Sequence, residues 1–383
     1  MVPYFDHNAT TPLSSAAREA WLRAQDEAWS NASSPHRAGA RVKIRLDAAR
    51  RRLAEFLDSE PERLVFTAGA TEAAEAIFQH LARTLPVEQV ILVNPTEHPC
   101  VLGAARRHVG ESRLHWLPVT ADGVVTTDAL HAALREQPQA GAVVVMAANN
   151  ETGVLQPWAE LAAICREARC AYVCDASQWL GKLPASRLGE VDWCFGAAHK
   201  FGGPKSVGFL QVPSGADGFV VRPGTQEAGR RAGTEDFPGI AAMIAALQEA
   251  EQTQVLWETE RVHWREQFEN DVQRRLHGTR FVARGAERLW NTVSLCLPEG
   301  ENSRWVTRLD KRGFEVSTGS ACASGGEAPS HVLAALGFSA DEAKRVIRVS
   351  SGWTTSREDW QALADALVAV SAEVKPSGAV IRV

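Results

Sequence analysis

Short runs of apolar, mostly β-branched residues alternate with longer stretches of helical periodicity through the first two thirds of the chain. The runs lie at residues 64–66, 90–93, 142–146, 171–174 and 207–210. Each run is apolar at successive positions, which is typical of strands covered on both faces. Between them, stretches such as residues 73–81 and 158–168 repeat apolar positions with helical spacing. This alternation predicts an α/β domain with a mostly parallel sheet.

A different pattern begins near residue 235. Residues 235–277 form one long, charged stretch of helical character, which we interpret as a linker helix into a second domain. Shorter units follow, with strands predicted at residues 291–297 and 346–349 and helices at residues 331–336 and 357–374. This mixture predicts a small α+β domain.

The composition excludes several classes of protein. The chain has 383 residues, of which 45% are hydrophobic and 23% charged, as in ordinary globular proteins with room for two domains. A net charge of −5 argues against nucleic acid or an anionic membrane as a main partner, because both require a basic face. No apolar run is long enough for a membrane helix, and the first residues lack the pattern of a secretory signal.

The seven cysteines predict a reducing compartment, the cytoplasm, rather than a disulfide framework. Their number is odd, and none shows the CxxC spacing of a structural zinc site, so we expect no metal. Inert core thiols are expected at Cys165, Cys174, Cys194 and Cys296, which lie among apolar residues. Cys322 differs, because residues 317–326 around it are all small or flexible, as in an exposed loop. On the loop alone, an incidental thiol is the simpler interpretation.

Two polar residues follow predicted strands, at the sheet edge where ligands of parallel sheets bind. Lys200 lies in an apolar, glycine-rich turn after the strand at residues 193–195, where an amine loses its proton readily and can form a Schiff base. Asp175 ends another strand, where a carboxylate can pair with a protonated pyridine nitrogen. Considered alone, Lys200 could equally be interpreted as a surface lysine in a turn. Asp175 could equally be interpreted as the N-cap of a helix.

Two further turns carry weak signals of the same kind. Residues 67–72 are a strand-to-helix turn of small residues, whose exposed amides can bind a phosphate. His98 follows the strand at residues 90–93 and can stack on a ring or transfer a proton, although a single histidine is more often structural.

In this order and spacing, the segments resemble the group I cysteine desulfurases of the class V aminotransferase group, which are homodimeric pyridoxal-phosphate enzymes of fold-type I. The resemblance covers nearly the whole chain. The segments that carry it are residues 6–12, 31–36, 69–72, 149–153, 175–178, 198–200, 231–235, 319–322 and 348–350. It implies a large domain with a mostly parallel sheet of the seven-stranded type and a small α+β domain. The expected parts are an N-terminal segment 1–15 that joins the small domain, a large cofactor-binding domain 16–255, and a small domain 256–383 with the Cys322 loop.

The resemblance also implies how the cofactor is held. Lys200 binds pyridoxal 5'-phosphate covalently, Asp175 faces the pyridine nitrogen and Gln178 the phenolic oxygen. His98 stacks on the ring and is also expected to be catalytic. The other residues expected to bind the cofactor are Ala70, Thr71, Asn150 and His199, with Thr234 of the partner subunit.

For the substrate, the resemblance implies that Asn150 and Arg348 hold the carboxylate of L-cysteine, a task suited to a planar guanidinium. Cys322 attacks the sulfur, which gives L-alanine and a persulfide on Cys322. A sulfur-acceptor protein, such as a scaffold of iron–sulfur cluster assembly or a thiolation enzyme, then receives the sulfur from the homodimer. From the net charge and the lack of a long apolar run, we expect no direct contact with nucleic acid or membrane.

The chain departs from the family pattern at three places. Ala197 stands where the family has Ser or Thr as a phosphate ligand, a loss of about 1.5–3 kcal/mol for a charge-assisted hydrogen bond. Residues 327–330 read EAPS where the family has LEPS, and Trp353 replaces the arginine of a Gly-Arg pair. Residues 374–383 show no clear docking motif for a scaffold protein.

Two other functions stay open at the level of sequence. The first is a related pyridoxal-phosphate lyase acting on selenocysteine or another amino acid, which needs Lys200 but does not necessarily need Cys322. The second is a sulfur-relay or binding protein without turnover, which Ala197 slightly favours. The joint presence of five residues opposes it: Lys200, Asp175, His98, Arg348 and Cys322.

Overall fold

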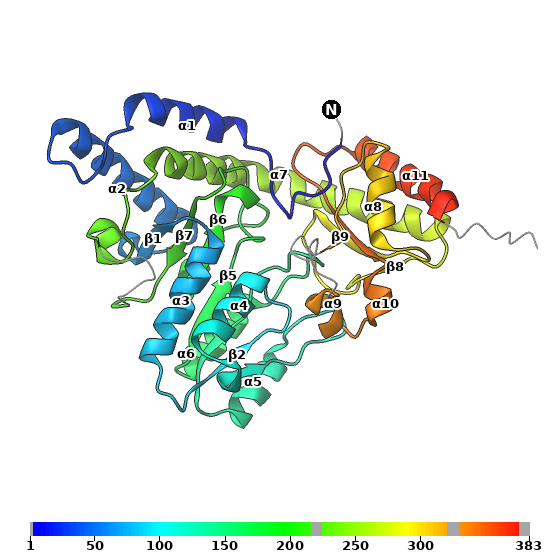
Figure 1. The fold of residues 1–383 in the computed structure, drawn as a ribbon, viewed down its shortest axis with the longest axis horizontal. Helices are drawn as coiled ribbons and strands as arrows, with labels where there is room; N and C mark the ends of the chain where they lie inside the picture. The colour runs from blue at the N-terminus through cyan, green and yellow to red at the C-terminus, as the bar shows by residue number, and fades with distance from the viewer. Residues whose placement is uncertain (1–2, 217–223, 320–328, 375–383) are drawn as a thin grey trace, which may run out of the picture.

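Seven strands form the larger of two sheets (Figure 1) in the computed structural model, which describes residues 3–216, 224–319 and 329–374, without the side chains of residues 254–258. The strands are β1 (Leu64–Thr67), β2 (Val90–Val93), β3 (Leu114–Trp116), β4 (Ala140–Val144), β5 (Ala171–Asp175), β6 (Trp193–Ala197) and β7 (Gly208–Gln211). Their order across the sheet is β1-β7-β6-β5-β4-β2-β3. Only β7 runs against the others, so the prediction of a mostly parallel sheet is confirmed.

Two details of this sheet differ from the expectation. The run at residues 207–210 was expected in a parallel sheet, but β7 is antiparallel to both neighbours. The ten residues between Ala197 and Gly208 are too few for the crossover that a parallel strand needs. Strand β3 was missed because only Leu114 of its three residues is buried, so it lacks an apolar run.

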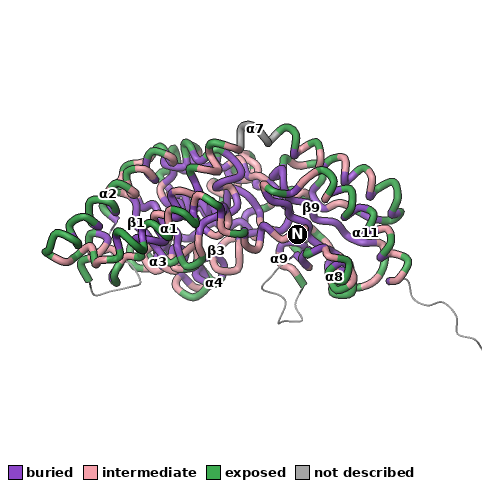
Figure 2. The backbone as a smooth tube through the Cα atoms, turned by 90° about the horizontal axis from the view of Figure 1, so that it is seen from above, coloured by how far each residue is buried: buried purple, intermediate pink, exposed green. Residues whose placement is uncertain are grey.

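Helices cover both faces of this sheet. They are α1 (Ser15–Glu27), α2 (Arg37–Leu57), α3 (Ala70–Thr84), α4 (Pro99–His108), α5 (Thr127–Glu136) and α6 (Trp158–Glu167). One core lies between α3, α4 and the sheet, and the second lies between the sheet and α2, α5, α6 and the start of α7 (Phe237–Arg275). The buried backbone between these layers is drawn in purple in Figure 2.

The second sheet is antiparallel, with the order β10-β9-β8, and its strands are β8 (Arg280–Phe281), β9 (Thr292–Cys296) and β10 (Val346–Ser350). Around it lie α8 (Asn302–Asp310), α9 (His331–Ala335), α10 (Ala340–Ala343) and α11 (Arg357–Val374). The mixed α/β fold with a second, smaller sheet therefore agrees with the prediction.

The N-terminal segment and helix α7 connect the two sheets. Phe5 is fully buried in the core of the second sheet, although it is far from that sheet in the sequence. Helix α7 places Met243 in the core of the large sheet and Phe268 in the core of the second (Figure 1). The exact limits at residues 15 and 255 stay a prediction.

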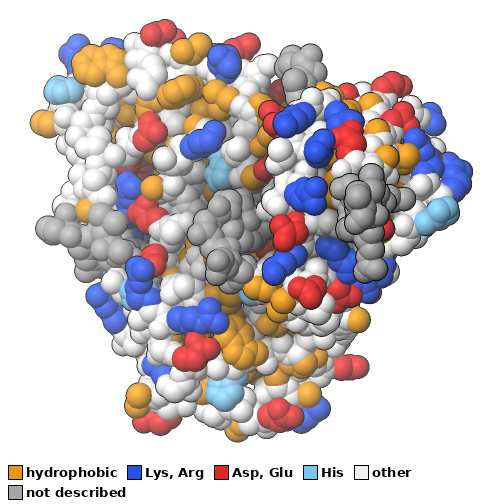
Figure 3. Space-filling view, turned by 45° about the vertical axis from the view of Figure 1, so that its right-hand side comes forward, with side chains coloured by type: hydrophobic (Ala, Val, Ile, Leu, Met, Phe, Trp, Pro, Cys, Tyr) orange, Lys and Arg blue, Asp and Glu red, His pale blue; other side chains and the backbone are white. Residues whose placement is uncertain are grey.

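The distribution of charged side chains on the surface and the burial of the cysteines agree with the expectations from composition. On the face seen in Figure 3, basic and acidic side chains are interspersed. The four cysteines expected in the core are all buried. Among the described helices, none has both the length and the apolar character that a membrane crossing requires.

Candidate active site

A cavity of about 530 Å³ lies where the carboxyl ends of the large sheet's strands meet the N-terminal segment and β10. Most of the predicted site residues line it: Ala70, Thr71, His98, Asn150, Asp175, Gln178, His199, Lys200 and Arg348. Thr234 does not line this cavity, and Cys322 lies outside the described residues. Residues that sequence reasoning did not single out also line it: Asn8, Cys100, Glu151, Lys205 and Ser206.

Lys200 ends a single 3-10 turn, Ala198–Lys200, which directly follows β6. Its Nζ donates to the carbonyl oxygens of Asn8, at 2.7 Å, and Ala9, at 2.9 Å. Burial, and then the charge of Arg348, lower the pKa of Lys200 to about 8. The interpretation as a surface lysine is therefore wrong, because the residue is half-buried and its amine loses its proton more readily than that of a solvated lysine.

Asp175 is the last residue of β5 and is buried in the cavity wall. Its Oδ1 accepts a hydrogen bond from the backbone N–H of Ser177 at 2.8 Å, and no helix begins there. The N-cap interpretation is therefore wrong. Burial raises the pKa of Asp175, while Ser177 and Lys200 lower it. A cationic nitrogen bound in the cavity would stabilise the ionised carboxylate.

His98 has a structural role and also faces the cavity. It is the N-cap of α4, and its Nδ1 accepts the backbone N–H of Cys100 at 3.2 Å. The neutral ring therefore carries its proton on Nε2. Burial lowers the pKa of His98 to about 4. The Sγ of Cys100 lies 3.0 Å from the same Nδ1, a second cavity thiol that no sequence signal indicated.

One end of the cavity is built to bind an anion. Helix α3 begins there at Ala70, its N-cap Gly69 has φ 132°, and no side chain caps its amides. A left-handed φ favours glycine, and uncapped amides at a helix N-terminus bind phosphate groups. His199 and Lys205 line the same cavity, whereas Ala197 contributes no hydroxyl. Lys205 was missed because a lysine among loop residues looks like any surface lysine.

Arg348 is held by groups of the chain itself. It lies in β10, and its side chain is 2% exposed. Nη2 pairs with Oδ1 of Asp6 at 2.6 Å, and Nη1 donates to the carbonyl oxygens of Asn150 at 3.0 Å and Gly319 at 2.7 Å. Its buried Nε has no hydrogen-bond partner among the described residues. The site therefore contains a rigid guanidinium whose Nε–H, and one N–H of Nη2, have no partner among these contacts.

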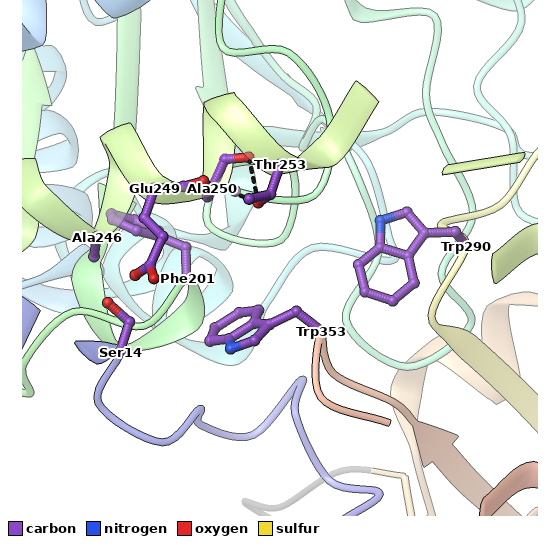
Figure 4. A pocket seen from close by; sticks show the side chains of 9 residues that line it. Ser14, Phe201, Ala246, Glu249, Ala250, Thr253, Trp290 and Trp353 are labelled. Carbon is purple, nitrogen blue, oxygen red and sulfur yellow. Dashed lines mark hydrogen bonds between the residues drawn. The ribbon is translucent and has the colours of Figure 1, made fainter. Parts of the chain in front are cut away.

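A second, smaller cavity of about 70 Å³ lies behind the turn that carries Lys200 (Figure 4). Phe201, Trp290 and Trp353 line it, so the tryptophan that replaces the family's arginine has an apolar place there. Of the side chains that the structure describes in its lining, only that of Glu249 is titratable. Because this cavity is small and mostly apolar, the larger cavity is the candidate active site.

The comparisons with known proteins agree with this geometry. The aminotransferase class V family matches residues 3–363. A cysteine desulfurase of Cereibacter sphaeroides is 35% identical over 367 residues, which are 93% of this chain and 92% of that protein. The solved structure of a NifS-like protein superposes with a TM-score of 0.88 at 28% identity and covers 97% of this chain and 100% of its own. Another solved structure, SspA in complex with cysteine, has a TM-score of 0.76 at 26% identity and covers 91% and 98%.

The chain therefore belongs to the class V aminotransferase family, and its relatives are cysteine desulfurases. The family uses pyridoxal phosphate, and the cavity fits that group. Uncapped helix amides suit the phosphate, the buried carboxylate of Asp175 suits the ring nitrogen, and the amine of Lys200 suits the aldehyde.

Proposed function

We propose that the protein is a cysteine desulfurase that converts L-cysteine to L-alanine and leaves the sulfur as a persulfide on Cys322. The relatives named cysteine desulfurase, and the related SspA structure with bound cysteine, support this substrate. The observation that carries the proposal is the meeting of Lys200, Asp175, His98 and Arg348 on one cavity.

Pyridoxal phosphate, when held in this cavity, would supply an electron sink for the Cα of the amino acid, so that the Cα proton would become acidic. Arg348 and Asn150 orient the substrate carboxylate, and Asp175 keeps a negative charge opposite the ring nitrogen. Lys200 is the proposed base, because its pKa of about 8 leaves part of the amine neutral at neutral pH. His98 carries its proton on Nε2 and is proposed to donate a hydrogen bond into the cavity. The ammonium formed on Lys200 is the proposed source of the proton that the product takes up.

The thiolate of Cys322 attacks the sulfur of the substrate. The new S–S bond forms as the C–S bond breaks, and the carbon keeps the electron pair and takes up a proton to give L-alanine. Cys322 itself lies outside the described residues, but a residue on each side of this segment contacts a residue that lines the cavity. The carbonyl of Gly319 accepts from Arg348, and the hydroxyl of Ser330 donates to Glu151 at 2.6 Å.

We also propose that the protein acts in the cytoplasm as a homodimer. Large apolar side chains are exposed on α1, on α2 and on the segment between them: Trp21, Leu22, Trp29 and Ile44. A subunit contact would remove these side chains from water. Thr234, which lies away from its own cavity, would then reach the phosphate site of the partner. The acceptor is proposed to be a protein of iron–sulfur assembly or thiolation.

The test is turnover of L-cysteine by the purified protein with pyridoxal phosphate. We expect equal amounts of alanine and transferred sulfur, and a persulfide on Cys322 detected by mass spectrometry. Cys322→Ala is expected to keep the visible absorption of the cofactor and to lose sulfur transfer, while Lys200→Ala loses both. The matched control is Cys296→Ala, a buried thiol far from the chemistry in the second sheet. Full sulfur release by Cys322→Ala would show that the thiol is not the nucleophile.

A further inference from the structure

Lys182 is a buried amine that the proposed reaction does not use. It is 4% exposed and follows Gln178 in the loop after β5. Its Nζ donates to the backbone oxygen of Gln178 at 3.2 Å and to Oε1 of the same residue at 2.9 Å. No carboxylate lies within ion-pair distance of it in the described part of the chain. Burial of an ammonium without a counterion is unfavourable, which indicates a specific use.

Close backbone packing around Gly181 holds Lys182 near the turn that carries Lys200. Gly181 has φ 71°, and a Cβ there would overlap the Cβ of Phe201, the residue after Lys200. Trp290, which also lines the small cavity of Figure 4, donates its Nε1 to the carbonyl of Lys182 at 3.1 Å. The lysine is therefore fixed between the two cavities.

The hydrogen bonds of Gln178 determine which end of its carboxamide faces which partner. Lys182 can only donate, so Oε1 must face it. The carbonyl of Asn8 can only accept, and Nε2 donates to it at 2.9 Å. Gln178 lines the larger cavity, and Nε2 has no second acceptor among the described residues. One N–H of the amide is therefore left for a ligand.

Lys182 lies close to other basic groups of the site. Burial, and then the charges of Lys200 and Arg348, lower the pKa of Lys182 to about 7. Burial, and then the charge of Lys182, lower the pKa of His7 to about 3, so His7 is neutral. An anion bound in the cavity close to Lys182 would stabilise its charged form.

We propose that Lys182 is a positioning residue that acts through Gln178: its charge polarises the carboxamide, so that the free N–H becomes a strong donor to the anionic phenolic oxygen of the cofactor. Chains of hydrogen bonds strengthen one another in this way in a medium of low dielectric. The inference rests on the proposed function, because it requires the cofactor in the cavity.

The experiment is a pH titration of the visible absorption of the holoenzyme in wild type, Lys182→Met, Gln178→Ala and the double variant. Positive charge near the phenolic oxygen eases loss of the proton shared between that oxygen and the Lys200 nitrogen. We therefore expect Lys182→Met to raise the absorbance midpoint by about one pH unit. In the Gln178→Ala background the same substitution is expected to have almost no effect. Lys311→Met, an exposed lysine to methionine change, is the matched control.

The outcomes separate this inference from the proposed function. An unchanged midpoint in Lys182→Met, or an equal shift with and without Gln178, would overturn the inference alone. Lys182→Gln keeps an N–H donor without the charge and is expected to shift the midpoint in the same direction. If both Lys182 variants fail to fold, as judged by thermal unfolding of the apo protein, the lysine serves the fold and the inference is wrong. A wild-type protein that stays colourless with pyridoxal phosphate overturns the proposed function as well.

Discussion

The pKa of Lys200 predicts how the apo protein captures its cofactor as the pH changes. The amine reacts with an aldehyde only when it is neutral. With a pKa of about 8 instead of 10.5, about one amine in ten is neutral at pH 7, compared with about one in three thousand for an ordinary lysine. Burial is the main cause and the charge of Arg348 the second. At pH 7 the amine of Lys200 is therefore expected to react with the aldehyde roughly three hundred times faster than a solvated lysine, because more of it is neutral.

The assay is stopped-flow absorbance of apo protein mixed with pyridoxal phosphate between pH 6 and pH 10. Below pH 8 the rate is expected to rise about tenfold per pH unit, because each unit adds tenfold more neutral amine. Above pH 8 the rate is expected to level off. Lys200→Ala is the control and is expected to give no visible band.

One result would refute the reasoning directly. If the rate continues to rise tenfold per unit up to pH 10, the amine has the pKa of a solvated lysine, and burial does not activate it. A plateau near pH 8 that persists in Lys200→Ala would assign the reaction to another amine of the cavity, such as Lys205.

Three further predictions concern stability and titration. Glu269→Ala leaves the buried guanidinium of Arg288 without its 2.8 Å partner, and should lower the free energy of unfolding in urea by about 3–5 kcal/mol. Gly181→Ala places a Cβ against Phe201 at a left-handed φ and should cost about 1–3 kcal/mol and weaken cofactor binding, measured by thermal unfolding and by absorbance. His98 should titrate near pH 4 in the NMR spectrum of the apo protein. Because the unfolded chain takes up this proton first, stability present above about pH 6.5 should be lost as the pH falls to about 4.

Local sequence patterns were sufficient to predict the strands that end next to the candidate active-site residues. The apolar runs ending at Asp175 and before Lys200 predicted strands, and the structure has strands there. The direction of β7 could not be predicted from its apolar run, because the length of the connection from β6 decides it. Strand β3 could not be predicted in this way, because only one of its residues is buried.

The contacts between distant segments could not be read from the chain. Asp6 and Arg348 are 342 residues apart, and no pattern of spacing indicates that the aspartate holds the arginine. No sequence signal indicated Lys182, and its burial follows from the packing of Gly181 and Trp290 around it.

The sequence by itself determined the class of fold, the residue types at the ends of the strands and the family, because these depend on local periodicity and on motifs in a given order. Only the tertiary structure decided which side chains share the cavity, how Lys200 and Arg348 are held, and that a buried lysine lies behind Gln178. Burial, charge and hydrogen-bond partners are properties of the packed chain, and they determine the pKa values on which the proposed chemistry depends.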